Sequence, residues 1–176
     1  MKKIIISVLV LAVGALGYWL LSPLWRAEVV NEALPEETVS PVASNNTAVP
    51  QAPQGVSAET EATAPAEPKE FYRGNFTGFD RLHQGSGTAK IVRVGDKTYL
   101  RFESDFTVSN GPDLFVGFGK DGQYSSGSEV GVLKGNVGSQ NYELIGEFDA
   151  SRYNEVYVWC RAFSVPFAKA PLVPVQ

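Results

Sequence analysis

The chain has 176 residues, in which 15 lysine and arginine residues are set against 19 aspartate and glutamate residues. The formal net charge of −4 leaves no basic excess, so the composition argues against a nucleic-acid-binding protein. A single histidine and a single cysteine also exclude a protein zinc site of the usual kind, which needs several such ligands.

Residues 1–26 predict a transmembrane signal anchor. Lys2 and Lys3 precede an uncharged run over residues 4–25, and about 20 apolar residues are enough to cross a bilayer as a helix. Positive charge is concentrated before this run, which predicts a cytoplasmic N-terminus. A cleaved signal peptide, giving a secreted protein, is the alternative, although its best small-residue cleavage site leaves only a short apolar core. We therefore expect a single-pass cell-membrane protein, embedded through residues 4–25, with its C-terminal domain outside the cytoplasm.

The next segment, residues 27–68, is rich in proline, alanine and glutamate and contains no lysine, arginine, histidine or aromatic residue. Such a sequence cannot bury enough apolar surface to offset the entropy lost on ordering. We expect a disordered acidic tether that holds the following domain away from the membrane.

Residues 69–176 contain all ten phenylalanines and the only cysteine and histidine, and they are enough for one hydrophobic core. Apolar side chains such as Leu100 and Phe102 alternate with Arg101 and Glu103, as in a half-buried strand. Regularly spaced turn sequences predict an all-β fold, an antiparallel β-sandwich or barrel-like sandwich of seven or eight strands. The expected strands cover residues 70–76, 88–94, 97–108, 113–118, 128–133, 141–145 and 154–163.

Cys160 is an unpaired cysteine in a chain expected to be exported, where cysteines usually form disulfides. Strand alternation puts Cys160 on the same face as Val158, and Tyr157 and Trp159 on the opposite face. Three interpretations remain open. Cys160 is an inert core residue, or it is a redox thiol or thiolate ligand, with Trp159 and Tyr157 as aromatic contacts or electron conduits. The third is an intermolecular disulfide through Cys160. His83 is the other candidate soft ligand, although a lone histidine before a glycine-rich turn is more typical of a surface residue.

An ordered set of motifs, spread over roughly residues 71–173, resembles the DM-thirteen electron-transfer domain family. The last and most specific of these motifs places Trp159 and Cys160 before a phenylalanine at position 163. The full set is Phe79-x-x-x-x-His83-x-x-x-Gly87-Thr-Ala, Leu100-Arg-Phe-Glu-x-x-Phe106, Gly111-Pro-Asp-Leu114, Leu133-Lys-Gly-Asn136 with Tyr142, and Val156-x-Val-Trp-Cys160-x-x-Phe-x-Val165-x-Phe167-x-x-Ala170.

The resemblance implies an all-β module built around one cysteine, which corresponds to Cys160. In the family this cysteine is proposed to act in electron transfer, as a naked thiol or by holding a prosthetic group such as haem. Asp113 matches a further family position, where turn formation is the simpler role. Multidomain relatives carry DOMON domains beside the module. This sequence shows only the module, so we expect its redox or envelope partner to be a separate protein. The alternative is a non-enzymatic adhesion or ligand-binding domain in which Cys160 is structural.

Overall fold

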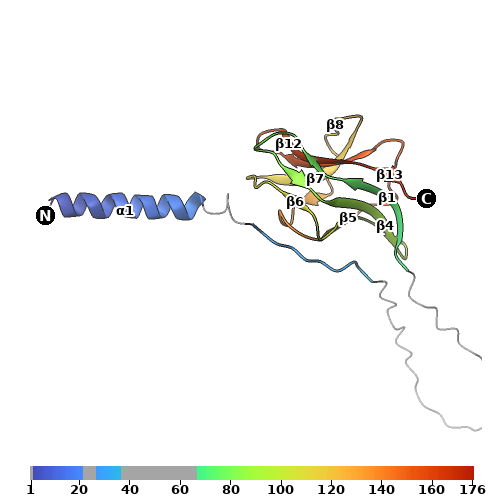
Figure 1. The fold of residues 1–176 in the computed structure, drawn as a ribbon, viewed down its shortest axis with the longest axis horizontal. Helices are drawn as coiled ribbons and strands as arrows, with labels where there is room; N and C mark the ends of the chain where they lie inside the picture. The colour runs from blue at the N-terminus through green and yellow to red at the C-terminus, as the bar shows by residue number, and fades with distance from the viewer. Residues whose placement is uncertain (1, 22–26, 37–66) are drawn as a thin grey trace, which may run out of the picture.

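Antiparallel β-sheets make up most of the structure, a computed structural model that describes residues 2–21, 27–36 and 67–176 (Figure 1). A helix, α1 (Lys2–Leu21), lies at the N-terminus, and strands β1 to β13 follow. The first sheet has the order β10 (Gln140–Glu143), β5 (Lys97–Phe102), β4 (Thr88–Val94), β1 (Lys69–Asn75) and β13 (Val173–Pro174). The second has the order β2 (Thr77–Gly78), β12 (Val165–Pro171), β11 (Glu155–Cys160), β7 (Leu114–Lys120) and β8 (Gln123–Tyr124), with β9 (Gly131–Val132) also paired to β7. A small third sheet joins β3 (Gly85–Ser86) to β6 (Thr107–Val108).

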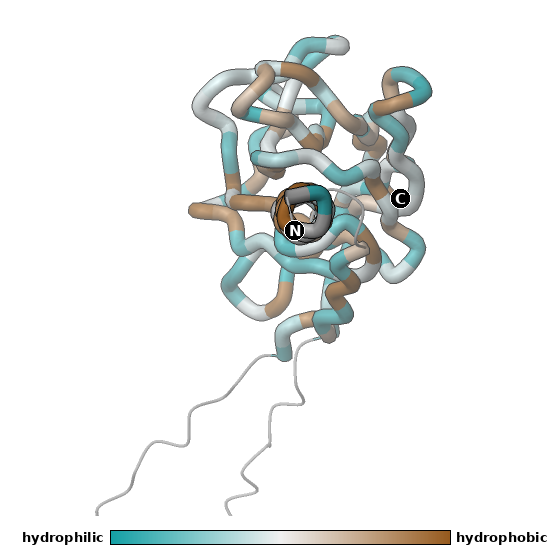
Figure 2. The backbone as a smooth tube through the Cα atoms, turned by 90° about the vertical axis from the view of Figure 1, so that its left-hand side faces the viewer, coloured by the Kyte–Doolittle hydropathy of each residue, from teal (hydrophilic) through white to brown (hydrophobic). Residues whose placement is uncertain are grey.

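The two larger sheets curl around one hydrophobic core, which confirms the expectation of a mostly β, antiparallel fold. Apolar residues alternate with polar ones along the chain of the β-domain (Figure 2), and the apolar set points inward. Leu100 and Phe102 of the first sheet and Val116 and Val158 of the second are essentially inaccessible to solvent. Burying each such side chain contributes about 1.5–3 kcal/mol, so the pairing of these faces drives folding.

The hairpin between β4 and β5 shows how local sequence fixes the register of the first sheet. Gly95 has a positive φ of 59°, whereas Asp96 does not, which is the pattern of a two-residue turn with glycine at its first central position. Val94 is then directly paired with Lys97, and the ladder continues to Ala89 opposite Phe102. Only glycine adopts this conformation without strain, so the order Gly-Asp suits the turn.

One of the expected strands is markedly shorter in the structure. The strand expected over residues 97–108 ends at Phe102, because Phe106 N–H donates to Glu103 O and closes a turn. Asp105 holds this turn by accepting hydrogen bonds from the backbone N–H and hydroxyl of Thr88, at 2.9 and 2.8 Å. The alternation of buried and exposed side chains nevertheless continues through the turn, since Phe106 and Val108 are both buried.

The N-terminal helix does not meet the expectation of a membrane span. In the described parts of the chain, no helix is long and apolar enough to cross a bilayer. The described helix α1 covers Lys2–Leu21 and includes both Lys2 and Lys3, while residues 22–25 of the expected run lie outside the described residues. The location of the β-domain outside the cytoplasm stays a prediction.

The start of the expected tether, residues 27–36, is not free of the domain. It runs in an extended conformation along the loop after β9, and Val29 forms a parallel bridge with Val137. Val30 N–H donates to Val137 O at 2.9 Å, and Glu32 N–H donates to Ser139 O at 3.0 Å. Composition alone does not predict these backbone hydrogen bonds between the segment and the domain, and the disordered tether stays a prediction. Residues 37–66 of the expected tether lie outside the described residues.

Candidate functional site

Strand β11 is in the middle of the second sheet, with β7 on one side and β12 on the other. Cys160, its last residue, is paired with Leu114 of β7 and Val165 of β12. Side chains alternate along the strand, so Cys160 lies on the core face, while Trp159 and Tyr157 lie on the outer face. The two candidate elements of the site are therefore on opposite sides of one strand.

The thiol of Cys160 is enclosed by the core. Its exposed fraction is 0%, and it belongs to the same apolar cluster as Val156 and Val158. A cavity of about 270 Å³ at this end of β7 is lined by Asp113 and Leu114 but not by Cys160. A haem held by this sulfur would need open space beside it, so the residues around Cys160 do not fit such a group. This burial is what an inert core cysteine would show.

On the outer face, four aromatic side chains form a continuous series, which we call the aromatic row: Trp159, Tyr124, Tyr157 and Phe79. The rings of Trp159 and Tyr124 are stacked, with centroids 4.4 Å apart and planes inclined by 6°. Tyr124 meets Tyr157 edge to face at 5.8 Å, and Tyr157 meets Phe79 at 6.2 Å. Both geometries are favoured by the ring quadrupoles, so the series is held together by direct contacts.

Two glycines of β7 make room for the aromatic row. The alternating sequence Phe115-Val-Gly-Phe-Gly119 leaves Gly117 and Gly119 without side chains on the outer face. A Cβ atom at Gly117 would lie 3.0 Å from Tyr124 Cε2, and one at Gly119 would overlap the ring of Tyr157. The tyrosine rings therefore lie across the bare backbone of β7, which lets Tyr124 from β8 reach Trp159 on β11.

Each tyrosine of the row donates a hydrogen bond to a carboxylate. Tyr124 O–H donates to Glu129 Oε1 at 2.7 Å, and Tyr157 O–H donates to Glu155 Oε2 at 3.1 Å. Burial and the adjacent Glu129 raise the pKa of Tyr124, and burial and Glu155 raise that of Tyr157. Chiefly because of the bond from Tyr124, the pKa of Glu129 is lowered. The neutral phenols are thus each paired with a group able to accept their proton.

Asp113 lies at the end of β7 that adjoins Cys160, and it is bound by the residue that follows the cysteine. Arg161 Nε donates to Asp113 Oδ2 at 3.0 Å, and its terminal nitrogen donates to Oδ1 at 3.3 Å. Arg161 N–H also donates to Asp113 O, and the guanidinium lies 4.1 Å from the ring centroid of Phe115. These contacts hold the start of β7 and the end of β11 together beside Cys160.

His83 is occupied away from Cys160. Its Nδ1 lies 2.7 Å from Asp80 Oδ2, and its ring packs edge-on against Phe167 at 4.5 Å. Asp80 also accepts hydrogen bonds from the backbone N–H groups of Leu82 and His83. The hydrogen bond with the imidazole has the largest effect, and together these bonds lower the pKa of Asp80 to about 2. His83 and Cys160 thus form no hydrogen-bonded dyad. In the described residues, no group of three His, Cys, Asp or Glu side chains could hold a metal ion.

The fold defines a class of protein, an all-β domain with one buried cysteine at the end of a central strand and aromatic side chains behind it. A family model described as "Electron transfer DM13" matches residues 76–172. The chain therefore belongs to the DM13 electron-transfer family, as the motifs around Cys160 indicated. No curated protein and no solved structure matches the chain.

Sequence reasoning identified Trp159 and Tyr157 but missed the residues that link and support them. Tyr124 belongs to β8 and Glu129 to the loop after it. They come close to β11 only because β8 and β11 both pair with β7. The alternating glycines of β7 were the available signal, because a strand that lacks side chains on one face leaves space for rings from its neighbours.

Proposed function

We propose that this domain passes single electrons along the aromatic row. The observation that carries the proposal is the stacking of Trp159 on Tyr124, with ring centroids 4.4 Å apart. Contact between π systems gives an electron a short path from ring to ring. Because glycines of β7 already make room for the rings, little rearrangement accompanies a change of charge. Membership of an electron-transfer family supports the same function.

The hydrogen-bonded carboxylates balance the chemistry of the step. A one-electron oxidant, carried by a separate redox protein, takes one electron from Tyr124, and the phenol proton moves to Glu129 Oε1 along the 2.7 Å hydrogen bond. A neutral phenoxyl group and a protonated Glu129 result. A one-electron donor reverses the step, and the proton returns to the phenol oxygen. Tyr157 and Glu155 form a second phenol–carboxylate pair further along the row.

The row has an open end that suits a docking partner. Phe79, its last member, is 43% exposed, whereas Tyr157 is buried. A partner that covers Phe79 would come within one ring of Tyr157, and a buried centre can exchange electrons without touching the partner. The partner is therefore expected to be a one-electron carrier with an apolar contact surface.

The redox role of Cys160 stays a prediction. Its position one residue from Trp159 favours a link between the thiol and the row, while its complete burial favours the alternative, a ligand-binding domain in which Cys160 is structural. The two functions differ in whether electrons pass along the aromatic row. They are distinguished by the radicals that form when the protein is oxidised.

The test is photochemical oxidation of the full chain by a ruthenium tris-bipyridine complex, followed by electron paramagnetic resonance of the trapped radicals. We expect a tyrosyl signal in the wild-type chain that falls at least severalfold in Tyr124→Phe and changes its decay in Trp159→Phe. Tyr153→Phe is the matched control, since Tyr153 lies outside the row against Phe118 and should leave the signal unchanged. Equal signals in Tyr124→Phe and wild type would overturn the proposal.

The same experiment tests the thiol. If Cys160 exchanges electrons with the row, Cys160→Ser changes the radical yield or its lifetime, provided that the folded state is intact by circular dichroism. An unchanged signal in a folded Cys160→Ser chain would leave the row as the conductor and assign Cys160 to the core.

A further inference from the structure

Residues 28–33 occupy a groove on the β-domain in the way that an added strand would. Val137 N–H donates to Glu28 O at 3.2 Å, and Val30 N–H donates back to Val137 O at 2.9 Å. The start of the segment is fixed by Glu28 N–H, which donates to Asn136 Oδ1 at 2.6 Å. Main-chain hydrogen bonds of this kind are the usual means by which an extended peptide binds to a sheet edge or loop.

Two glycines at the floor of the groove allow the backbone of the segment to approach closely. A Cβ atom at Gly135 would lie 2.6 Å from both Glu28 O and Val30 Cγ2. Gly138 has a positive φ of 94°, and a Cβ atom there would overlap Val30 O. Side chains at these two positions would close the groove. Residues 134–141, which comprise the loop after β9 and the first two residues of β10 and which we call the loop, are therefore specific for a closely apposed chain.

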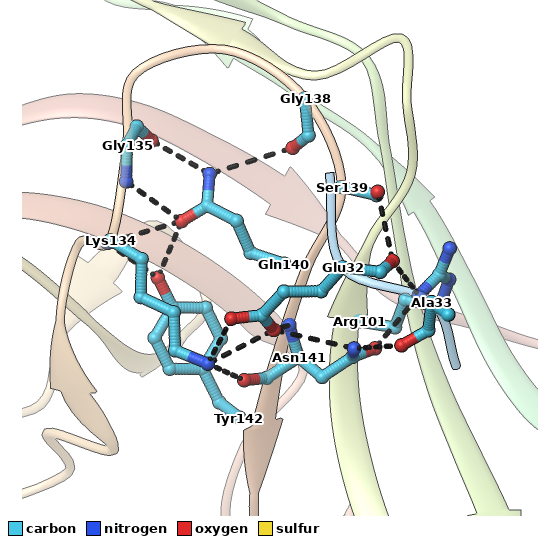
Figure 3. A network of polar contacts seen from close by, with 10 residues as sticks. All are labelled: Glu32, Ala33, Arg101, Lys134, Gly135, Gly138, Ser139, Gln140, Asn141 and Tyr142. Atoms are coloured by element: carbon cyan, nitrogen blue, oxygen red, sulfur yellow. Dashed lines mark hydrogen bonds and ion pairs between the residues drawn. The ribbon is translucent and has the colours of Figure 1, made fainter. Parts of the chain in front are cut away.

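Glu32 is the charged anchor of the segment (Figure 3). Its carboxylate lies 2.7 and 3.0 Å from Lys134 Nζ, and Oε2 accepts hydrogen bonds from Asn141 N–H and its side-chain amide at 2.8 and 3.3 Å. The backbone oxygen of Glu32 accepts from the Ser139 hydroxyl at 3.0 Å and from Arg101 at 3.3 Å. Charge-assisted hydrogen bonds are among the stronger polar contacts in proteins, and the Glu32 carboxylate forms several of them.

Hydrogen bonds of the Gln140 side chain hold the groove in shape. The Gln140 side chain is completely buried, and its Oε1 accepts hydrogen bonds from the N–H groups of Lys134 and Gly135 and from the Tyr142 hydroxyl. Its amide donates to Gly135 O at 2.7 Å (Figure 3). The loop is thus held in shape by the core, and it presents a preformed site.

We infer that residues 28–33 and the loop over residues 134–141 form a clasp that holds the β-domain close to α1, the loop being a binding site for an extended acidic peptide that the chain fills with its own segment. From Leu21 to Glu28 an extended chain spans at most about 25 Å. A free coil of the length of residues 27–68 would have a typical end-to-end distance of roughly 35 Å and a much longer reach. A closed clasp therefore changes a long tether into a short one, and residues 37–66 connect two segments that both lie on the domain.

The clasp also borders the end of the sheet that holds Cys160. Glu28 lines the 270 Å³ cavity together with Asp113 and Leu114, whose strand β7 is paired with Cys160. Glu28 forms one wall of this cavity, so opening of the clasp would remove that wall.

Disulfide trapping in the full chain tests the clasp. Val29 and Val137 are bridge partners, and paired strands lie about 4.8 Å apart, within the range that a disulfide spans. We expect Val29→Cys with Val137→Cys to form an intramolecular cross-link in mild oxidant, seen as a mobility shift on non-reducing electrophoresis. The control pair is Val29→Cys with Val173→Cys. Val173 is 60% exposed, as Val29 is at 59%, but it belongs to β13, in a different part of the structure. A cross-linked dimer would instead show exchange of the segment between two copies, and no cross-link would show that it is not docked; either result overturns the inference.

Hydrogen exchange of the unmodified backbone gives an independent measurement. The amides of residues 28–33 are expected to exchange slowly in the full chain, and Glu32→Gln should speed their exchange by at least roughly tenfold, because a charge-assisted contact is lost. Glu28→Gln is the matched control, since the docking of Glu28 uses its backbone atoms. Fast exchange in the wild-type chain, or equal effects of the two substitutions, would overturn the clasp.

Discussion

The indole of Trp159 and the phenol ring of Tyr124 lie nearly parallel, inclined by 6°, although they belong to strands on opposite sides of β7. The contact exists because the strand between them carries glycine where a side chain would separate the rings. It joins two residues that are far apart in the sequence into one surface, and it makes the outer face of the second sheet the most distinctive feature of the domain.

Gly119→Ala should destabilise the domain by about 1–3 kcal/mol, because a new methyl group would overlap the ring of Tyr157 and the backbone of Gln123. The measurement is the urea dependence of unfolding. Gly131→Ala is the control: a Cβ atom there would meet Tyr142 at an ordinary 3.4 Å, so we expect a change within about 0.5 kcal/mol. Equal stability of the two variants would contradict the role given to the glycines of β7.

Tyr124→Phe should raise the pKa of Glu129 towards its ordinary value of 4.5, because the hydrogen bond from the phenol is the main cause of the lowered pKa. A lowered pKa in the folded state contributes stability above the unfolded pKa, and this contribution is lost as the pH falls through the folded value. Nuclear magnetic resonance titration of the Glu129 carboxyl in both chains gives the comparison. An unchanged pKa in Tyr124→Phe would show that the hydrogen bond is not formed in solution.

The thiol of Cys160 should resist alkylation in the native chain and react promptly after denaturation, since its exposed fraction is 0%. Cys160→Ser should lower the free energy of unfolding by about 1–3 kcal/mol, because it buries a hydroxyl among apolar groups. Iodoacetamide labelling followed by mass spectrometry measures the first effect. A native chain with Val173→Cys provides the exposed thiol for comparison. Labelling of Cys160 at the rate of that thiol would contradict the enclosed site.

Docking of residues 28–33 should weaken in acid. Burial raises the pKa of Glu32, but hydrogen bonds from Lys134 and Asn141 outweigh it and hold the pKa below 4.5. The docked state is therefore favoured above the ordinary pKa of a glutamate, and the advantage disappears as the pH falls through the lowered value. The other charged groups nearby are Arg101, which donates to Glu32 O, and Glu143, which lines the adjoining cavity.

The acid effect is measured from the amide chemical shifts of Val30 and Glu32 between pH 7 and pH 3. In the wild-type chain we expect both signals to move towards unstructured positions at the acid end. Glu32→Gln has no carboxyl at this position, so its shifts should change far less over the same range. Parallel titration of the two chains would mean that other groups control docking.

Some features of the fold could be predicted from local pattern, and others could not. The hairpin of β4 and β5 and the inward direction of Leu100 and Phe102 follow from a turn glycine and a period of two. Strand β12 was missed because Pro166 and Pro171 argue against a strand in the middle of a sheet. The register shift between Val158 and Trp159 accommodates this, since a bulge leaves room for a residue that does not fit the regular ladder.

The sequence by itself determined the β class, the faces of β11 and the family, because these depend on the order and spacing of neighbouring residues. Only the tertiary structure decided that Cys160 is sealed in the core, that Tyr124 completes a row with Trp159, and that residues 28–33 bind the domain. The physical reason is distance along the chain. Glu32 and Lys134 are 102 positions apart, and no local pattern states which distant backbone groups will form a hydrogen bond once the sheets have closed.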